Sequence, residues 1–355
     1  MAATSTTIDS PPEFETYDNG HQIPLIVFGS ISAFLSLVGS GCIVVMASRK
    51  LKKSIMDRFL FALSISDMIS STGNLLMQWL IPFSLNLAGA IGNHASCSAT
   101  GFLLMTGNIA GCIFNSYLSC YFFLVVRFSF KEKDFSKAAE IMAYLFAATA
   151  SLSLNIAALV TESINPSPLF NSVCTYATYP WTCNENEDLD CERSSREKVT
   201  PIVYVGGSIL LIFTILGFVC TTMVAYSVRK TLKRSIAHRF EGDRDEAGEE
   251  RLRQVSIQAI VYSLVYLNTF FWPFVGAVLS SQYVHTAEEI QEIKMEPRYY
   301  AFQFLYWMLY PLQVNFFDNL RHSTCLSALG SQKAAHFTSF YSGLSEFLCL
   351  HEKPS

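Results

Sequence analysis

Seven apolar stretches of membrane-crossing length dominate this 355-residue sequence. A helix rises only about 1.5 Å per residue, so about 20 mostly apolar residues are needed to cross the hydrocarbon core of a bilayer. A helix also pairs all of its backbone N–H and C=O groups internally, which is necessary inside lipid because no water is present to pair with them. The predicted spans are Ile23–Ser48, Phe59–Phe83, Ala99–Val126, Ala138–Val160, Ile202–Val228, Val255–Leu279 and Tyr299–Phe317. The sequence therefore predicts an all-α membrane protein, a bundle of seven transmembrane helices.

The charged residues agree with this interpretation. They make up 15% of the chain, whereas soluble domains contain about a quarter. They cluster between the apolar stretches. The formal net charge is only -4, and the basic residues form no single patch. The composition therefore argues against nucleic acid as a partner and makes the lipid bilayer the expected surroundings.

The positions of Lys and Arg predict the orientation of the bundle. Twenty of the 25 lie after spans one, three and five or in the C-terminal tail, and five lie on the other side. Cytoplasmic loops carry the excess of basic residues. We therefore expect a multi-pass protein of the cell membrane, with its N-terminus outside and its C-terminus in the cytoplasm. Residues 1–22 are expected to form a flexible, acidic extracellular tail without a cleavable signal, residues 23–322 the bundle, and residues 323–355 a cytoplasmic tail.

Four of the ten cysteines fall on the predicted outer side, where conditions are oxidising. These are Cys97, Cys174, Cys183 and Cys191. Four cysteines allow three connectivities, and spacing alone does not choose among them. We favour Cys97–Cys174, which would tie the second outer loop to span three, together with Cys183–Cys191.

Asp67 is the one ionisable residue well inside a predicted span. Such groups are costly in lipid and need polar partners. We expect a polar network of Asp67 with Ser40, Asn115 and Asn315. Two roles stay open for the carboxyl group, because it could bind a cation or proton, or it could be a purely structural hydrogen-bonded acid.

Amide and aromatic side chains in the spans predict a ligand pocket. Asn108, Cys112 and Asn115 are spaced so that they share one face of span three, and amides avoid lipid. Ordinary interhelical packing is the competing explanation for each residue. The predicted ligand-binding residues are Gln78, Trp79, Asn108, Trp272, Gln303 and Trp307.

Prolines and arginines suggest how a signal would reach the other side. A proline removes a helix hydrogen bond and kinks a span, so Pro273 and Pro311 are the predicted switch positions. Arg127, Arg251 and Arg253 lie at predicted cytoplasmic ends, where they would contact a protein partner, although contact with acidic lipids alone also accounts for such charges.

No enzyme chemistry is predicted. All seven histidines lie outside the predicted spans, which disfavours a histidine-ligated metal site in the membrane. No lysine lies within a span to form a retinal Schiff base. No nucleophile, base and metal ligands are clustered, so we expect no cofactor and no catalytic residues.

Several short motifs resemble the G-protein-coupled receptor superfamily. Seven spans, a cysteine at the start of span three, and Asp67 within Leu-Ser-x-x-Asp are shared with that superfamily. Pro311-Leu312-Gln313 looks like the Pro-Leu-Gln-Gly motif of the cyclic-AMP receptor-like group of microbial eukaryotes, although Val314 replaces its glycine. The run from Tyr117 to Phe128 is similar in character to that group's third span. Asp-Arg-Tyr and Asn-Pro-x-x-Tyr are absent, so the resemblance, which covers residues 23–322, is not to the rhodopsin-like class.

This resemblance implies a receptor that transmits an extracellular signal to a heterotrimeric G protein. The ligand would bind among the outer halves of spans two, three, six and seven, and span six would swing at Pro273 to open a cytoplasmic cleft. The alternative is an ion-coupled transporter or channel in which Asp67 is the coupling group.

Overall fold

A computed structural model describes residues 19–49, 54–85, 87, 89–128, 137–167, 173–180, 183 and 190–238. This part of the chain is mostly helical. Its five long helices are α1 (Asn19–Arg49), α2 (Ile55–Met77), α3 (His94–Phe128), α4 (Lys137–Val160) and α5 (Arg196–His238). Each is long and apolar enough to cross a membrane, at the places where the first five spans are predicted. The predicted sixth and seventh spans lie outside the described residues.

The ends of α2 differ from the prediction. Ser54 caps the start, because its Oγ accepts a hydrogen bond from the Asp57 backbone N–H at 3.1 Å while the Asp57 carboxylate accepts one from the Ser54 N–H at 3.3 Å. The helix ends at Met77, and Pro82, which cannot continue a helix, lies shortly beyond it. The predicted end at Phe83 is therefore wrong, and that residue begins the short 3-10 helix η1 (Phe83–Leu85).

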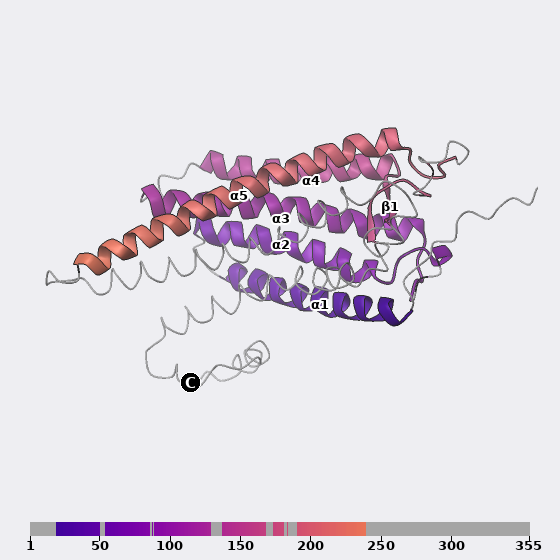
Figure 1. Ribbon diagram of the computed structural model, residues 1–355, viewed down its shortest axis with the longest axis horizontal. Coiled ribbons are helices and arrows are strands. Elements are labelled where there is room, and N and C mark those ends of the chain that lie inside the picture. The colour runs from indigo at the N-terminus through magenta and orange to yellow at the C-terminus, as the bar shows by residue number, and fades with distance from the viewer. Residues whose placement is uncertain are drawn as a thin grey trace, which may run out of the picture.

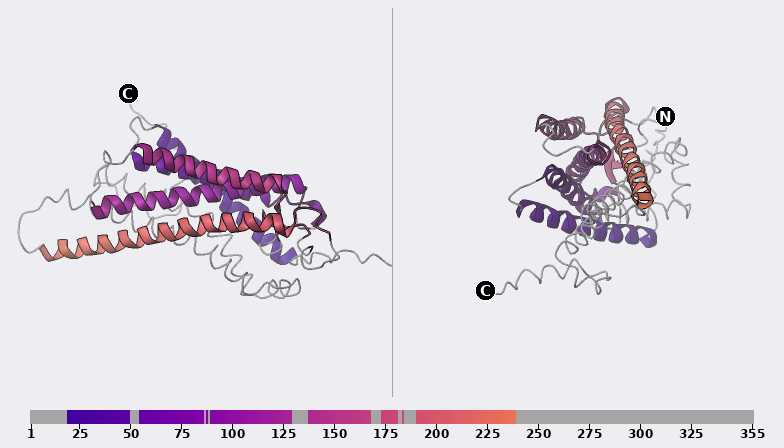
Figure 2. Two further views of the ribbon diagram at one scale, coloured as in Figure 1. Left: turned by 90° about the horizontal axis from the view of Figure 1, so that it is seen from above. Right: turned by 90° about the vertical axis from the view of Figure 1, so that its left-hand side faces the viewer.

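The helices form an antiparallel bundle with α3 at its centre (Figure 1). Helix α3 packs against α2, α4 and α5, and α1 packs against α2. A two-stranded antiparallel sheet, β1 (Ile164–Ser167) and β2 (Val173–Tyr176), covers the end of the bundle where α3 begins. We call this the hairpin end and the opposite one the far end. Figure 2 shows that α5 extends past the other described helices at the far end.

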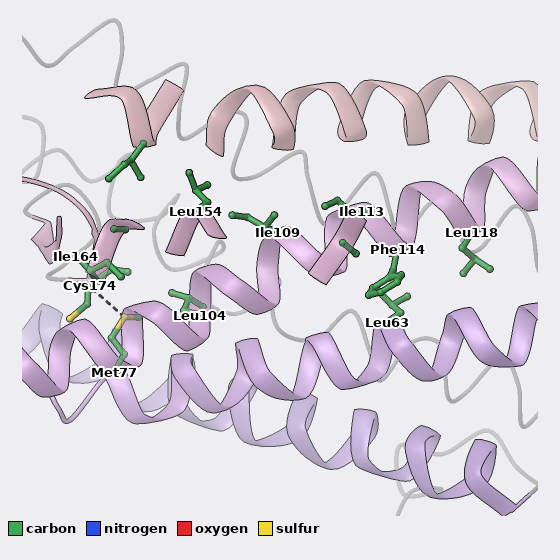
Figure 3. Packing of buried hydrophobic residues seen from close by; sticks show 14 of the residues in the cluster. Leu63, Met77, Leu104, Ile109, Ile113, Phe114, Leu118, Leu154, Ile164 and Cys174 are labelled. Carbon is green, nitrogen blue, oxygen red and sulfur yellow. Dashed lines mark hydrogen bonds between the residues drawn. The ribbon is translucent and has the colours of Figure 1, made fainter. Parts of the chain in front are cut away.

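The core follows the length of α3. Ile109, Ile113 and Leu118 of this helix are buried, and Figure 3 shows them between side chains of the neighbouring helices. Two glycines let α2 and α3 approach closely. A Cβ atom on Gly73 would lie 2.6 Å from the Leu104 backbone nitrogen, and one on Gly107 would lie 2.5 Å from that of Ser70. Small residues at such contacts are typical of helices packed within a membrane.

The outward faces of the bundle are apolar. Phe34 of α1, Met142 of α4 and Ile212 of α5 are 55%, 63% and 61% exposed, and many large apolar side chains around them are exposed as well. Water-soluble proteins rarely expose apolar surface continuously, whereas lipid tails cover it without cost. These faces are consistent with a membrane protein.

Candidate functional site

The hairpin cap, which we define as β1, β2 and residues 177–180, is anchored to the start of α3. A disulfide joins Cys97 of α3 to Cys174 of β2. Ser98 Oγ donates a hydrogen bond to the Ile164 carbonyl at 3.0 Å. Gly101 makes room for the cap, because a Cβ atom there would lie 2.6 Å from the Cys174 carbonyl oxygen. The cap is therefore fixed to α3 by a covalent bond and by close backbone packing.

The cap also contacts α2. The Cys174 backbone N–H donates a hydrogen bond to Met77 Sδ at 3.2 Å, drawn in Figure 3 as a dashed line. A second disulfide joins Cys183 to Cys191. Both favoured cysteine pairs are thus present, while the acidic residues between Cys183 and Asp190 lie outside the described residues.

A row of polar residues follows one side of α2 below the cap. Helical spacing places these residues within one face, and we call them the α2 polar stripe: Asp67, Ser70, Ser71, Asn74 and Gln78. Ser70 Oγ donates a hydrogen bond to Asn108 Oδ1 of α3 at 2.6 Å. Ser71 Oγ donates one to Ser36 Oγ of α1 at 3.0 Å. The stripe therefore connects α2 with both neighbouring helices.

Asn74 is one of three residues of the stripe, with Ser70 and Ser71, that sequence reasoning missed. Its side chain is 2% exposed, and its Oδ1 has no hydrogen-bond partner in the described part of the chain. Gln78, one turn nearer the cap, is 8% exposed. The periodicity of polar residues in span two was the signal that could have found Asn74. The stripe thus holds a buried amide oxygen that can accept a hydrogen bond.

Three of the four predicted members of the Asp67 network lie among the described residues. Asp67 is half-buried and faces Gly111 of α3, where a Cβ atom would lie 3.7 Å from Asp67 Oδ1. Asn115 is half-buried on the same helix. Ser40 is fully buried, but its Oγ has no hydrogen-bond partner among the described residues, so it does not bond to Asp67. The fourth predicted member, Asn315, lies outside the described residues.

The polar face predicted on α3 divides between two neighbours. Asn108 faces α2 through Ser70, whereas Cys112 Sγ lies 3.7 Å from Thr214 Oγ1 of α5. Two further contacts, which the sequence did not reveal, follow along α5. Ser116 Oγ donates a hydrogen bond to the Phe213 carbonyl at 2.6 Å, and the Sγ atoms of Cys120 and Cys220 are 3.1 Å apart. Small polar groups therefore line the contact between α3 and α5.

The remaining predicted pocket residues are not brought together within the described chain. Trp79 is 45% exposed, next to the buried Gln78. Gly89 packs near its ring with a φ of 78°, a backbone conformation that suits glycine. The predicted pocket residues Trp272, Gln303 and Trp307 and the predicted switch residues Pro273 and Pro311 lie outside the described residues.

The far end holds one ion pair that the sequence did not suggest. Glu140 of α4 pairs with Arg58 of α2, with Nε–Oε1 at 2.5 Å and Nη2–Oε2 at 2.8 Å. Arg127, the predicted partner contact, is exposed in the last turn of α3. The other predicted contacts, Arg251 and Arg253, lie outside the described residues.

Neither a metal-ligand cluster among the described residues nor a matching family model assigns a chemistry to this site. Within the described residues, no group of three or more His, Cys, Asp or Glu side chains is arranged to hold a metal ion. No family model matches the sequence, and no curated protein matches it. The features that bear on function are the anchored cap, the α2 polar stripe and the exposed Arg127 in the last turn of α3.

Proposed function

We propose that this chain is a seven-transmembrane receptor, similar to G-protein-coupled receptors and without catalytic activity. Its N-terminus and hairpin end would face the outside of the cell membrane, and its far end and C-terminus would face the cytoplasm. An extracellular ligand would bind beneath the hairpin cap, and a heterotrimeric G protein would bind at the far end.

The observation that carries the proposal is the buried Oδ1 of Asn74, which has no hydrogen-bond partner among the described residues. Leaving a buried acceptor unpaired costs about 1–3 kcal/mol, and a ligand with a hydroxyl or amine donor would recover this energy. Asn74 lies one turn below Met77, which contacts the disulfide-anchored cap. An anchored cap near this buried acceptor supports binding of a small polar ligand between the cap and the α2 polar stripe.

The far end supports contact with a cytoplasmic partner. Arg127 is exposed there, and the sequence of the last turns of α5 contains Arg229, Lys230, Lys233 and Arg234. Twenty of the 25 basic residues fall in segments that the sequence predicts to be on this side, which is expected for cytoplasmic segments. A ligand that binds one arrangement of the bundle more tightly shifts the population toward it. In this proposal span six swings at Pro273, with Pro311 as a second switch position in span seven, and opens a cytoplasmic cleft. Arg127, Arg251 and Arg253 would contact the G protein there.

A ligand screen with a nucleotide-exchange readout tests the proposal. The full-length protein in nanodiscs is mixed with purified heterotrimers and with small polar compounds, and guanine-nucleotide exchange is measured. An active compound should lose potency about 10-fold in Asn74→Leu, which cannot pair with a donor. The matched control is Thr222→Val, which also removes a polar side chain but on the exposed face of α5, and it should leave the potency unchanged.

A second pair of variants tests the cytoplasmic contact. Arg127→Ala should reduce exchange while ligand binding is retained, whereas Arg49→Ala, which removes another exposed arginine at the far end, should not. Equal exchange in Arg127→Ala and the native protein would remove Arg127 from the mechanism. Absence of exchange with every heterotrimer and compound would contradict the receptor proposal.

Ion-coupled transport is the second candidate, and one observation favours it. Asp67 belongs to the α2 polar stripe, which runs from there towards the hairpin end. Polar groups of this kind can accompany an ion pathway. Flux measured in proteoliposomes that disappears in Asp67→Asn would support transport over the receptor.

A further inference from the structure

The hairpin cap makes a second, noncovalent contact with the start of α3, through His94. This histidine is the first residue of α3, and its ring packs edge-on against Tyr179, with ring centroids 4.5 Å apart. Tyr179 and Arg193 exchange two backbone hydrogen bonds of 3.0 Å each. Arg193 Nη2 then donates a hydrogen bond to Ser98 Oγ on α3 at 3.2 Å. These residues thus form a closed set of contacts, which we call the His94 contact.

Two polar atoms of the His94 contact are buried without a hydrogen-bond partner among the described residues. These are His94 Nδ1 and Arg193 Nε. In the same part of the chain, three titratable or charged side chains face the imidazole: Tyr179, Arg193 and Glu192. Burial of the ring is the largest effect that lowers the His94 pKa, Arg193 lowers it further, and the exposed Glu192 raises it. No other charged side chain occurs between His94 and Gly101 of α3.

We propose that the His94 contact is a proton-sensitive latch, which holds residues 177–180 against α3 while His94 is neutral and releases them when it is protonated. A protonated ring would place a second cation beside Arg193, at the positive end of the α3 dipole. It would also carry a buried Nδ1–H with no acceptor. Because Cys97–Cys174 keeps β2 attached, release is confined to the part of the cap around Tyr179 and Arg193.

The direction of the effect follows from which state takes up the proton. Once the latch is open, His94 meets solvent and titrates near the ordinary histidine pKa of about 6.5. The closed latch binds the proton less readily, so acid favours the open form and closure is lost as the pH falls below that range. The latch does not require a ligand or a G protein, and it can therefore be tested independently of the proposed receptor function.

Hydrogen exchange on the full-length protein in zwitterionic nanodiscs measures the latch directly. At about pH 7.5 and pH 5.5, exchange is followed at the Tyr179 and Arg193 amides and corrected for the intrinsic rate at each pH. We expect protection of both amides to fall several-fold at the lower pH, and by no more than about 10-fold, because an open-state pKa of about 6.5 limits the effect that can develop by pH 5.5. The Thr175 and Tyr176 region, held by the disulfide, should keep its protection.

Three variants complete the test. His94→Gln should remove the pH-dependent change, because glutamine does not titrate, and His94→Asn serves the same purpose if the glutamine variant is poorly folded. Arg193→Gln keeps the histidine but removes the opposing charge, so the pH-dependent change should shrink. His21→Gln, which removes another histidine of the same chain, should leave it unaltered. An unchanged protection of Tyr179 and Arg193 in the native protein at low pH, or the full change persisting in His94→Gln, would overturn the proposal.

Discussion

At the scale of single residues, the ion pair of Arg58 and Glu140 is a contact on which the far end depends. Glu140 is 8% exposed, and the pair joins α2 to α4 across 82 positions of sequence. Arg58→Ala would leave the Glu140 carboxylate buried without this partner. We expect a loss of about 1–3 kcal/mol, toward the lower end because the Arg58 side chain is 37% exposed and partly screened by solvent.

Thermal unfolding in detergent micelles checks this expectation. Arg49→Ala is the matched control, because Arg49 is exposed at the end of α1 and should change stability little. Equal midpoints for the two variants would show that the pair contributes nothing to stability.

A second residue-scale prediction concerns Tyr176 of the hairpin cap. Its hydroxyl donates a hydrogen bond to Asn155 Oδ1 at 2.7 Å, and Asn155 Nδ2 donates one to the Ser151 carbonyl at 2.8 Å. Burial raises the pKa of the Tyr176 phenol. The folded state therefore holds this proton more tightly than the unfolded state does, and the stabilisation is lost as the pH rises above the ordinary tyrosine value of about 10.

We expect Tyr176→Phe to cost about 1 kcal/mol at neutral pH and to lose less stability than the native protein on going to alkaline pH. Tyr204→Phe, on the exposed face of α5, is the control and should follow the native curve. The measurement is the unfolding midpoint as a function of pH. If the midpoints of Tyr176→Phe and of the native protein fall equally at alkaline pH, the prediction is contradicted.

At the scale of helices and strands, the close approach of α2 and α3 depends on glycine. A Cβ atom on Gly73 would lie 2.6 Å from the Leu104 nitrogen and 2.8 Å from the Thr100 oxygen, both backbone atoms that cannot move aside singly. We expect Gly73→Ala to destabilise the protein by about 1–3 kcal/mol because the helices must separate. Gly207→Ala meets nothing within 4 Å and should be neutral or slightly stabilising.

The yield of folded protein and its unfolding midpoint measure both glycine variants. If Gly73→Ala and Gly207→Ala behave alike, the contact between α2 and α3 is less tight than described.

The two disulfides are expected to differ in how much they stabilise the hairpin end. Cys97–Cys174 joins residues 77 positions apart, and Cys183–Cys191 joins residues 8 positions apart. Loop-closure entropy assigns about 4.5 kcal/mol to the first and about 2.5 kcal/mol to the second. The double variant Cys97→Ser/Cys174→Ser should therefore unfold at a lower temperature than Cys183→Ser/Cys191→Ser. The reverse order would show that strand packing, and not chain connectivity, holds the cap.

At the scale of the whole molecule, the number of spans and their direction remain predictions. Epitope tags at the two ends should be accessible from opposite faces of intact cells, because seven is an odd number. The N-terminal tag should be outside, because most basic residues fall in the segments predicted to be cytoplasmic. Permeabilised cells provide the control in which both tags are bound. Two tags accessible on the same face of intact cells would contradict a seven-span bundle.

Much of the described fold was predictable because it depends on local composition. Long apolar runs must become helices in lipid whatever surrounds them, and the first five predicted spans correspond to α1 to α5. The end of α2 was predicted wrongly, because hydropathy continues through Leu80 and Ile81 while the helix ends earlier, before Pro82. At such a turn the sequence stays apolar although the backbone is no longer helical, so hydropathy alone does not locate the end of the helix.

The candidate site was predictable only in part. Polar residues in spans are rare enough to be noticed one by one, which identified Asp67, Gln78 and Asn108. Their partners were not visible, since Ser70 contacts Asn108 from another helix and Tyr179 meets His94 from a distant loop. Contacts between residues dozens of positions apart cannot be predicted from the spacing of residues within one segment.

The sequence by itself therefore determined that five described segments are helices long and apolar enough to cross a membrane, because the cost of unpaired backbone in lipid acts on each segment independently. Only the tertiary structure decided which polar atoms are satisfied and which, like Asn74 Oδ1 and His94 Nδ1, are buried without a partner among the described residues. A hydrogen bond between helices forms or fails on a difference of a few tenths of an ångström in the donor–acceptor distance, and helix packing sets that distance.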